Sequence, residues 1–228
     1  MQLTSPARIL LVLGSKDDRT AVQGLVLEGG SSFESVDNVE EARSKIAQAP
    51  FDLILLGAAD GQNASKISEL ANLQNEGHPL IAAFMEGEVW PAGYAAGVSV
   101  YLASAADATA FHQTVRGIPL LSGLVFDWDV ALENMGMMDI VQEIIKVFLA
   151  EAPALFAQVR QAMDEGCLPE IARAAHRFAG GIAVFGDIPC VKAARGLELA
   201  AEGGGSVSDF WFWLEQSYAR LYATLQAV

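Results

Sequence analysis

Cysteine and histidine are scarce in this chain. The 228 residues include only two cysteines and three histidines. Cys167 and Cys190 are not closely spaced, so they predict neither a zinc site nor a fold that needs an oxidising compartment. His78, His112 and His176 show no ligand spacing of the H-x-x-x-H kind, which argues against a hydrolytic or metal enzyme built on the three histidines.

Long hydrophobic runs and basic residues are also scarce. The apolar runs at 9–13 and 53–56 are far shorter than the roughly 20 residues of a membrane-spanning helix, and the opening MQLTSPAR lacks the pattern of a secretory signal. With 28 acidic and 14 basic residues, the formal net charge of −14 would repel nucleic acid and anionic membranes. We therefore expect a cytoplasmic protein whose partner is another protein or a small ligand.

The first half of the chain alternates between two kinds of pattern. Short apolar runs predict strands, and the stretches between them predict helices. This alternation is typical of a doubly wound α/β domain with a parallel sheet, which we place at 1–118. The predicted strands are 8–13, 32–36, 51–56, 79–84 and 98–102, and the predicted helices are 20–28, 39–48, 66–75, 91–96 and 106–115.

The second half, 124–228, shows no strand pattern after the segment 117–123, which contains Pro119. Helical patterns interrupted by glycine and proline predict an antiparallel helical bundle. Ser208 is the expected cap of the last helix, after a turn at 203–206. The predicted helices are 128–134, 138–165, 169–185, 188–202 and 208–226.

The segment RAAHRFAGGIAVFG at 173–186 combines a histidine with two glycines that disfavour a helix. One face of this helix is an apolar stripe that we expect to be buried. His176 faces the opposite side, where every neighbour except one arginine is small. The stripe consists of Ile171, Ala174, Ala175, Phe178, Gly181, Ile182 and Phe185, and the neighbours of His176 are Pro169, Ala172, Arg173, Ala179, Gly180 and Ala183.

The two glycines have different expected roles. Gly180, four residues after His176, removes the side chain that would lie nearest the imidazole and leaves it open to a partner. Gly181 is expected to permit close packing of a neighbouring helix. In the alternative interpretation, the small residues form a helix–helix contact that buries His176, and the histidine then has no function.

The same segment resembles the signature of histidine phosphotransfer (HPt) domains. In that signature the histidine is followed by a hydrophobic residue at +2, lysine at +3, glycine at +4, small residues, and glycine at +10. The flanking stretches VFLAEAPALFAQVRQAMDEG and CVKAARGLELAAEGG also resemble that family, so that the resemblance covers roughly 125–226. The corresponding residues here are His176, Phe178, Ala179, Gly180, Gly181 and Gly186.

The resemblance implies a four-helix bundle that carries a phosphoryl group on His176. It implies a phosphocarrier rather than a kinase or hydrolase, with receiver domains of response regulators or hybrid histidine kinases as partners. The Mg²⁺ ion would be held by the partner receiver, and no cofactor or metal is expected on this chain. Because Ala179 stands where lysine is usual, Arg173 or Arg177 is expected to replace that positive charge in part. In the alternative interpretation, both arginines are ordinary solvated residues. A non-phosphorylated adaptor that binds a receiver or kinase remains the alternative function.

The first half resembles a degenerate response-regulator receiver domain, whose fold is flavodoxin-like. At the positions of the Mg²⁺-binding acids, the phosphorylated aspartate, the hydroxyl residue and the lysine it has Leu13 with Gly14, Gly57, Phe84 and Ser104. The resemblance therefore implies a chemically silent pseudo-receiver, and we interpret Asp17, Asp18, Asp52 and Asp60 as turn and surface residues. Receivers commonly dimerise through their fourth and fifth helices, which suggests 91–96 and 106–115 as the surface of a homodimer.

Overall fold

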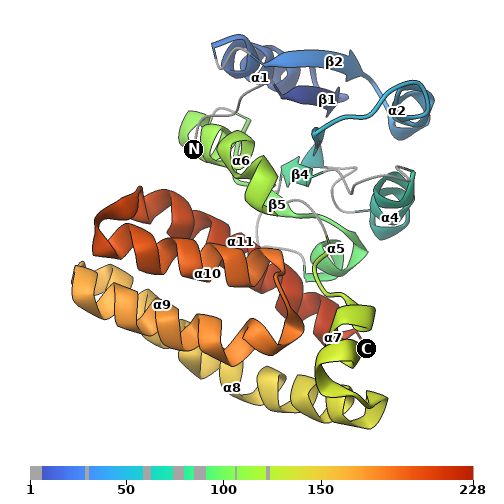
Figure 1. Ribbon diagram of the computed structural model, residues 1–228. Helices are drawn as coiled ribbons and strands as arrows, with labels where there is room; N and C mark the ends of the chain where they lie inside the picture. The colour runs from blue at the N-terminus through green and yellow to red at the C-terminus, as the bar shows by residue number, and fades with distance from the viewer. Residues whose placement is uncertain are drawn as a thin grey trace. The chain divides into compact units, whose positions relative to one another are not determined.

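The computed structural model describes residues 7–28, 31–58, 63–73, 80–84, 91–105, 107–121 and 124–227 (Figure 1). The chain divides into two compact units, Met1–Gly123 and Leu124–Val228. Each unit has its own buried apolar core.

The first unit contains a parallel sheet of five strands in the order β2-β1-β3-β4-β5. This order is the flavodoxin-like one, so the predicted fold class is confirmed. Ile9 of β1 is paired with Phe33 of β2 and with Leu53 of β3, which sets the register at the centre of the sheet. The strands are β1 (Arg8–Val12), β2 (Ser32–Val36), β3 (Leu53–Leu56), β4 (Leu80–Phe84) and β5 (Val100–Leu102).

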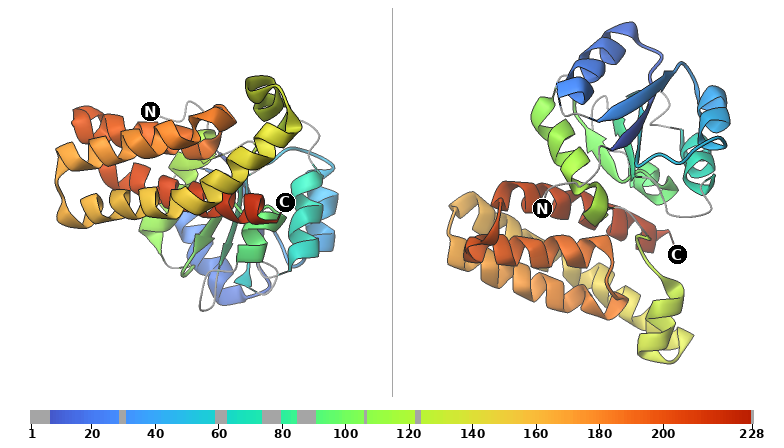
Figure 2. Two further views of the ribbon diagram at one scale, coloured as in Figure 1. Left: turned by 90° about the horizontal axis from the view of Figure 1, so that it is seen from below. Right: turned by 45° about the horizontal axis from the view of Figure 1, so that its top comes forward.

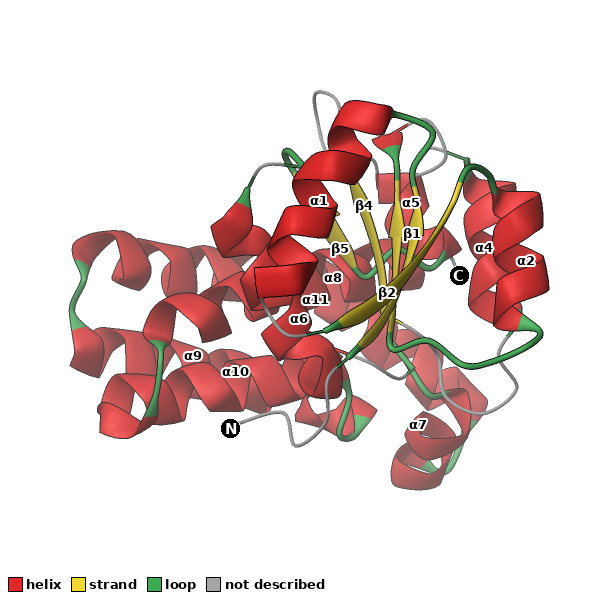
Figure 3. Cartoon of the chain, turned by 90° about the horizontal axis from the view of Figure 1, so that it is seen from above, coloured by secondary structure: helices red, strands yellow, loops and turns green. Residues whose placement is uncertain are grey.

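The sequences of the central strands are continuous apolar runs because helices cover both faces of the sheet. All residues of β3 and β4 are buried. Helix α1 contacts α6, whereas α4 contacts α2 and α5, and the two groups lie on opposite sides of the sheet (Figures 2 and 3). The helices are α1 (Lys16–Glu28), α2 (Val39–Ile46), α4 (Ala64–Asn72), α5 (Pro91–Ala96) and α6 (Ala108–Leu121).

The end of the first unit differs from the prediction. The sequence predicts that the last helix of this unit ends at residue 115, ahead of Pro119, a residue type that lacks an N–H and disfavours a helix interior. Instead α6 continues through Pro119 to Leu121. Ile118 and Leu121 are buried on this last turn, so apolar burial favours the helix where local propensity does not.

The second unit is a bundle of four helices (Figures 1 and 2). Each neighbours two others, since α9 contacts α8 and α10, and α11 contacts α10 and α8. The predicted helical bundle is thus confirmed. The four bundle helices are α8 (Met138–Glu165), α9 (Leu168–Ile182), α10 (Pro189–Leu199) and α11 (Val207–Gln226). The shorter helix α7 (Trp128–Met135) precedes them and contacts α8, and short turns of other helical types lie at η1 (Ala183–Phe185) and η2 (Ala200–Gly204).

Local details of the bundle correct two predictions. The predicted helix 169–185 is α-helical only to Ile182, and its last three residues form a 3₁₀ turn that ends at Gly186, whose φ of 89° suits glycine. The cap of α11 is Ser206 and not Ser208, because the Ser206 hydroxyl accepts a hydrogen bond from the Asp209 N–H at 3.2 Å.

Aromatic side chains fill the centre of the bundle. Phe178 and Phe185 of the signature segment are fully buried. Phe178 contacts Phe156 and Tyr218 edge to face, with ring centroids 5.7 and 5.5 Å apart. Cys190 is also buried here, and burial raises the pKa of its thiol to about 12, so it stays protonated and unreactive near neutral pH.

Candidate functional site

The α9 helix separates a buried face from an exposed one. Its apolar residues Ile171, Phe178 and Ile182 are buried against the bundle. His176 points away from them, and 73% of its side chain is exposed. The small residues around His176 therefore do not bury it in a helix–helix contact, which excludes the alternative that would have removed its function.

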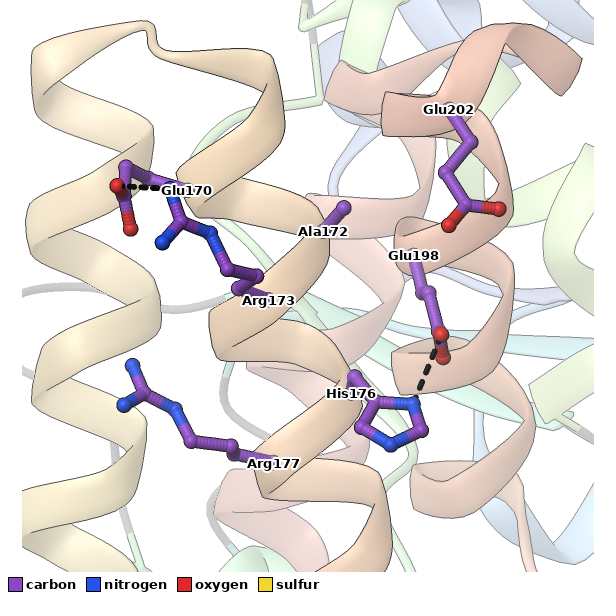
Figure 4. Close-up of a pocket in the computed structure, with 7 residues that line it drawn as sticks. All are labelled: Glu170, Ala172, Arg173, His176, Arg177, Glu198 and Glu202. Carbon is purple, nitrogen blue, oxygen red and sulfur yellow. Dashed lines mark hydrogen bonds and ion pairs between the residues drawn. The ribbon is translucent and has the colours of Figure 1, made fainter.

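A carboxylate on the neighbouring helix orients the imidazole of His176. Its Nδ1 lies 2.8 Å from Oε1 of Glu198 on α10 (Figure 4). The Glu198 side chain is only 23% exposed, so this bond is partly shielded from water. A carboxylate only accepts hydrogen bonds, so Nδ1 carries the proton and donates. The lone pair of the neutral ring is consequently on Nε2.

Two surface hollows flank the imidazole. The first is charged, and the second is lined mainly by small or apolar residues. Glu198 lines both, because it lies beside the ring. The first hollow is completed by Glu170, Ala172, Arg173, Arg177 and Glu202, and the second by Ala179, Gly180, Ala183, Arg195 and Leu199.

The arginines predicted to assist His176 are both on α9 but point elsewhere. Arg173 pairs with Glu170, and its Nε donates to the Pro169 carbonyl at 3.3 Å. Figure 4 shows the guanidinium of Arg177 directed to the side of α9 opposite Glu198. In the conformation seen, neither guanidinium lies beside the imidazole.

The glycines and Ala179 differ in their surroundings. A Cβ on Gly180 would meet nothing within 4 Å, so the space after His176 is open as predicted. A Cβ on Gly181 would lie 3.3 Å from Leu155 Cδ1, which makes it a close approach between α9 and α8. Ala179 was placed on the open face but is only 4% exposed. It forms the floor of the second hollow, because α10 packs beside it.

Sequence reasoning missed the contribution of α10. Arg195 and Glu198 of α10 and Glu202 of the following turn η2 recur at helical spacing, and all three line the hollows beside His176. This spacing of charged residues was visible in the sequence. The sequence did not show that this face of α10 adjoins the histidine of α9.

The remaining histidines are not brought to this site. His112 is on α6 of the first unit, where its ring contacts Phe111 with centroids 5.8 Å apart. His78 and Asp60 are outside the described residues. Among the residues that the structure does describe, no group of three His, Cys, Asp or Glu side chains is arranged to hold a metal ion.

The receiver-like positions of the first unit meet at one edge of the sheet. Leu13 and Gly57 directly follow β1 and β3, Phe84 ends β4, and Ser104 comes shortly after β5. Leu13 and Phe84 are buried, and a Cβ on Gly57 would lie 3.8 Å from Leu13 Cδ2. A side chain at residue 57 would therefore begin in van der Waals contact with the Leu13 side chain.

The acidic residues that are close in sequence to these positions are explained by local structure or lie at the other edge of the sheet. Asp17 and Asp18 are in the first turn of α1, where negative charge is favourable. Asp52 precedes β3 at the opposite edge of the sheet and accepts from the Arg8 N–H at 2.8 Å. At the carboxyl edge, the Arg19 guanidinium donates to the Leu13 carbonyl at 2.6 Å and pairs with Asp37.

Comparison with protein families assigns the second unit. Residues 143–228 match the family described as Hpt domain. The match includes α9 and α10 with His176 and Glu198, and so confirms the resemblance seen in the sequence. A search of curated proteins finds no match. Within the described parts of the chain, no helix has the length and apolar character required to cross a membrane.

Proposed function

Because residues 143–228 form an Hpt domain, which supports a histidine phosphotransfer role in a phosphorelay, we propose that His176 accepts a phosphoryl group from a receiver-domain aspartate and passes it on to another. The observation that carries this proposal is the bond from Nδ1 to Glu198. When the ring is neutral, this bond places the proton on Nδ1 and the lone pair on the exposed Nε2, and this is the form that can attack phosphorus.

The transfer needs little chemistry from this chain. The Nε2 lone pair forms a bond to phosphorus as the bond from phosphorus to the aspartate oxygen breaks, and the aspartate leaves as a carboxylate. No proton leaves Nδ1 in this step. The ring becomes positively charged, and the Glu198 carboxylate stabilises that charge. In this proposal the partner receiver brings the Mg²⁺ ion, and the chain itself needs no cofactor.

The first unit is proposed to be a chemically silent pseudo-receiver. This proposal is supported by the carboxyl edge of the sheet, where Gly57 has no acceptor oxygen and Leu13 and Phe84 are apolar and buried. A receiver aspartate reacts because carboxylates hold Mg²⁺ beside it. The homodimer through α5 and α6 remains a prediction.

Glu198→Gln tests whether the Glu198 carboxylate stabilises the positive charge that the imidazole acquires during transfer. Glutamine can still accept a hydrogen bond from Nδ1 but carries no charge, so we expect phosphoryl transfer to His176 to slow about tenfold. The measurement is the rate of label transfer from a phosphorylated receiver domain. Glu202→Gln is the matched control, since Glu202 lines the same hollow and no hydrogen bond joins it to the imidazole in Figure 4.

The result distinguishes the proposal from its alternative. Equal rates for Glu198→Gln and the parent would show that Glu198 does not act on the reacting ring. If a phosphorylated receiver binds the parent without labelling His176, the protein is an adaptor and the proposed transfer function is wrong.

The open space at Gly180 gives a second test. Gly180→Gln places a long side chain one turn after His176. Glutamine is also more favourable than glycine in a helix interior, by about 0.5–1 kcal/mol. The second unit should therefore unfold at the same or a higher temperature, while transfer from a phosphorylated receiver falls steeply. Gly180→Ala is the control, because it adds only a Cβ to space that is empty. Unchanged transfer in Gly180→Gln would mean that partners do not approach over this face.

A further inference from the structure

The direction of Nε2 decides where a phosphoryl group on His176 would lie. Because Glu198 holds Nδ1, the ring is fixed in one orientation. Figure 4 shows the other ring nitrogen pointing along α9 toward its C-terminal end, away from Glu170 and Glu202. On that side is the second hollow, which includes Ala179, Gly180 and Arg195. A group bonded to Nε2 therefore extends into this hollow.

The charges of the two hollows also favour the second hollow as the place of the phosphoryl group. The first hollow has three carboxylates, those of Glu170, Glu198 and Glu202, against two arginines. Arg173 is paired with Glu170, and the guanidinium of Arg177 is directed to the side of α9 opposite Glu198 (Figure 4). A phosphoryl group with nearly two negative charges is disfavoured there. The second hollow has Glu198 as its one acid and Arg195 as its base.

Arg195 is available to bind an anion. It is exposed on α10, one turn before Glu198. In the described part of the chain, no hydrogen bond or ion pair of Arg195 is found, so its guanidinium is not committed to a carboxylate. Arg177 is equally uncommitted, but its guanidinium lies on the opposite side of α9 (Figure 4).

We propose that Arg195 binds the phosphoryl group on Nε2 of His176, a role that rests on the proposed phosphotransfer function. Its planar guanidinium can donate two hydrogen bonds to two phosphoryl oxygens. The positive charge that the signature places at position 179 of α9 then comes from α10. Arg195 neutralises the phosphoryl group as it arrives and as it leaves, while Glu198 holds the opposite nitrogen of the ring.

Phosphoramidate is the probe that isolates this role from partner binding. This small donor transfers its phosphoryl group to Nε2 and releases ammonia, so no receiver surface is involved. We expect Arg195→Gln to be labelled about tenfold more slowly than the parent, as for loss of one charge-assisted hydrogen-bonding group. Arg195→Lys should be labelled at an intermediate rate, and the matched control Arg177→Gln at close to the parental rate.

Phosphorus NMR of the phosphorylated full chain gives a second readout. A guanidinium beside the phosphoryl oxygens favours their ionised form, so the phosphoryl pKa should be higher in Arg195→Gln than in the parent or Arg177→Gln. A structural role of Arg195 would not move this pKa. Circular dichroism checks that each variant is folded, as expected for exposed positions.

Each outcome decides the role of Arg195. Parental rates and an unchanged phosphoryl pKa in Arg195→Gln overturn it while leaving His176 as the acceptor. Slower labelling from a phosphorylated receiver but not from phosphoramidate also overturns it, because Arg195 then contacts the partner. Absence of label on His176 of the parent with either donor instead overturns the proposed function itself.

Discussion

His176→Gln is expected to reduce acid-labile, alkali-stable labelling of the chain to background. Glutamine has no nitrogen able to form the phosphoramidate bond, so the acceptor is lost rather than weakened. The fold should survive, because 73% of the His176 side chain is exposed and glutamine favours a helix more than histidine does. The measurement is incorporation of label from a phosphorylated receiver, compared with the parent at equal concentration.

His112→Gln is the matched control for this experiment. His112 is only partly buried and belongs to the first unit, so its loss should leave the labelling intact. If His176→Gln is labelled as strongly as the parent, the acceptor is another residue. If both variants lose label, the substitutions act through something other than the acceptor nitrogen.

The order of elements was predictable because burial leaves a clear pattern in both units. Strands covered on both faces must be apolar throughout, and the sequence LILL of β3 shows this directly. Helix ends were less predictable, because they depend on tertiary contacts. Pro119 argues for a stop, yet buried Ile118 and Leu121 extend α6 past it. At the start of α11, the sequence predicts Ser208 as the cap, whereas the helix begins two residues earlier and is capped by Ser206.

The candidate site was half predictable for a similar reason. The exposure of His176 and the empty space at Gly180 follow from the helical spacing of α9 alone. Glu198 and Arg195 belong to α10, and their meeting with His176 depends on how the two helices pack. Spacing along one helix carries no information about rotation of its neighbour. Spacing alone therefore favours the arginines of α9 as the positive charges, whereas the proposed role of Arg195 depends on the packing of α10 beside α9.

Phe178→Ala is expected to destabilise the second unit by about 3–5 kcal/mol, the usual loss when a buried phenylalanine is truncated. Phe178 is fully buried and contacts Phe156 and Tyr218, so truncation leaves a cavity between α8, α9 and α11. For a unit of this size the midpoint of thermal unfolding should fall by roughly 15 °C or more. Tryptophan fluorescence reports the change, because Trp128, Trp211 and Trp213 lie in this unit.

Phe178→Leu is the control, since it keeps the site apolar and most of it filled, and its loss of stability should be clearly smaller. The two substitutions also separate the core from the phosphotransfer face. Phe178 points away from His176 across α9, so Phe178→Ala should still accept a phosphoryl group at temperatures well below its unfolding midpoint. A folded Phe178→Ala protein without labelling would show that the imidazole depends on the packing behind it. An unchanged midpoint would show that Phe178 is not part of the bundle's core.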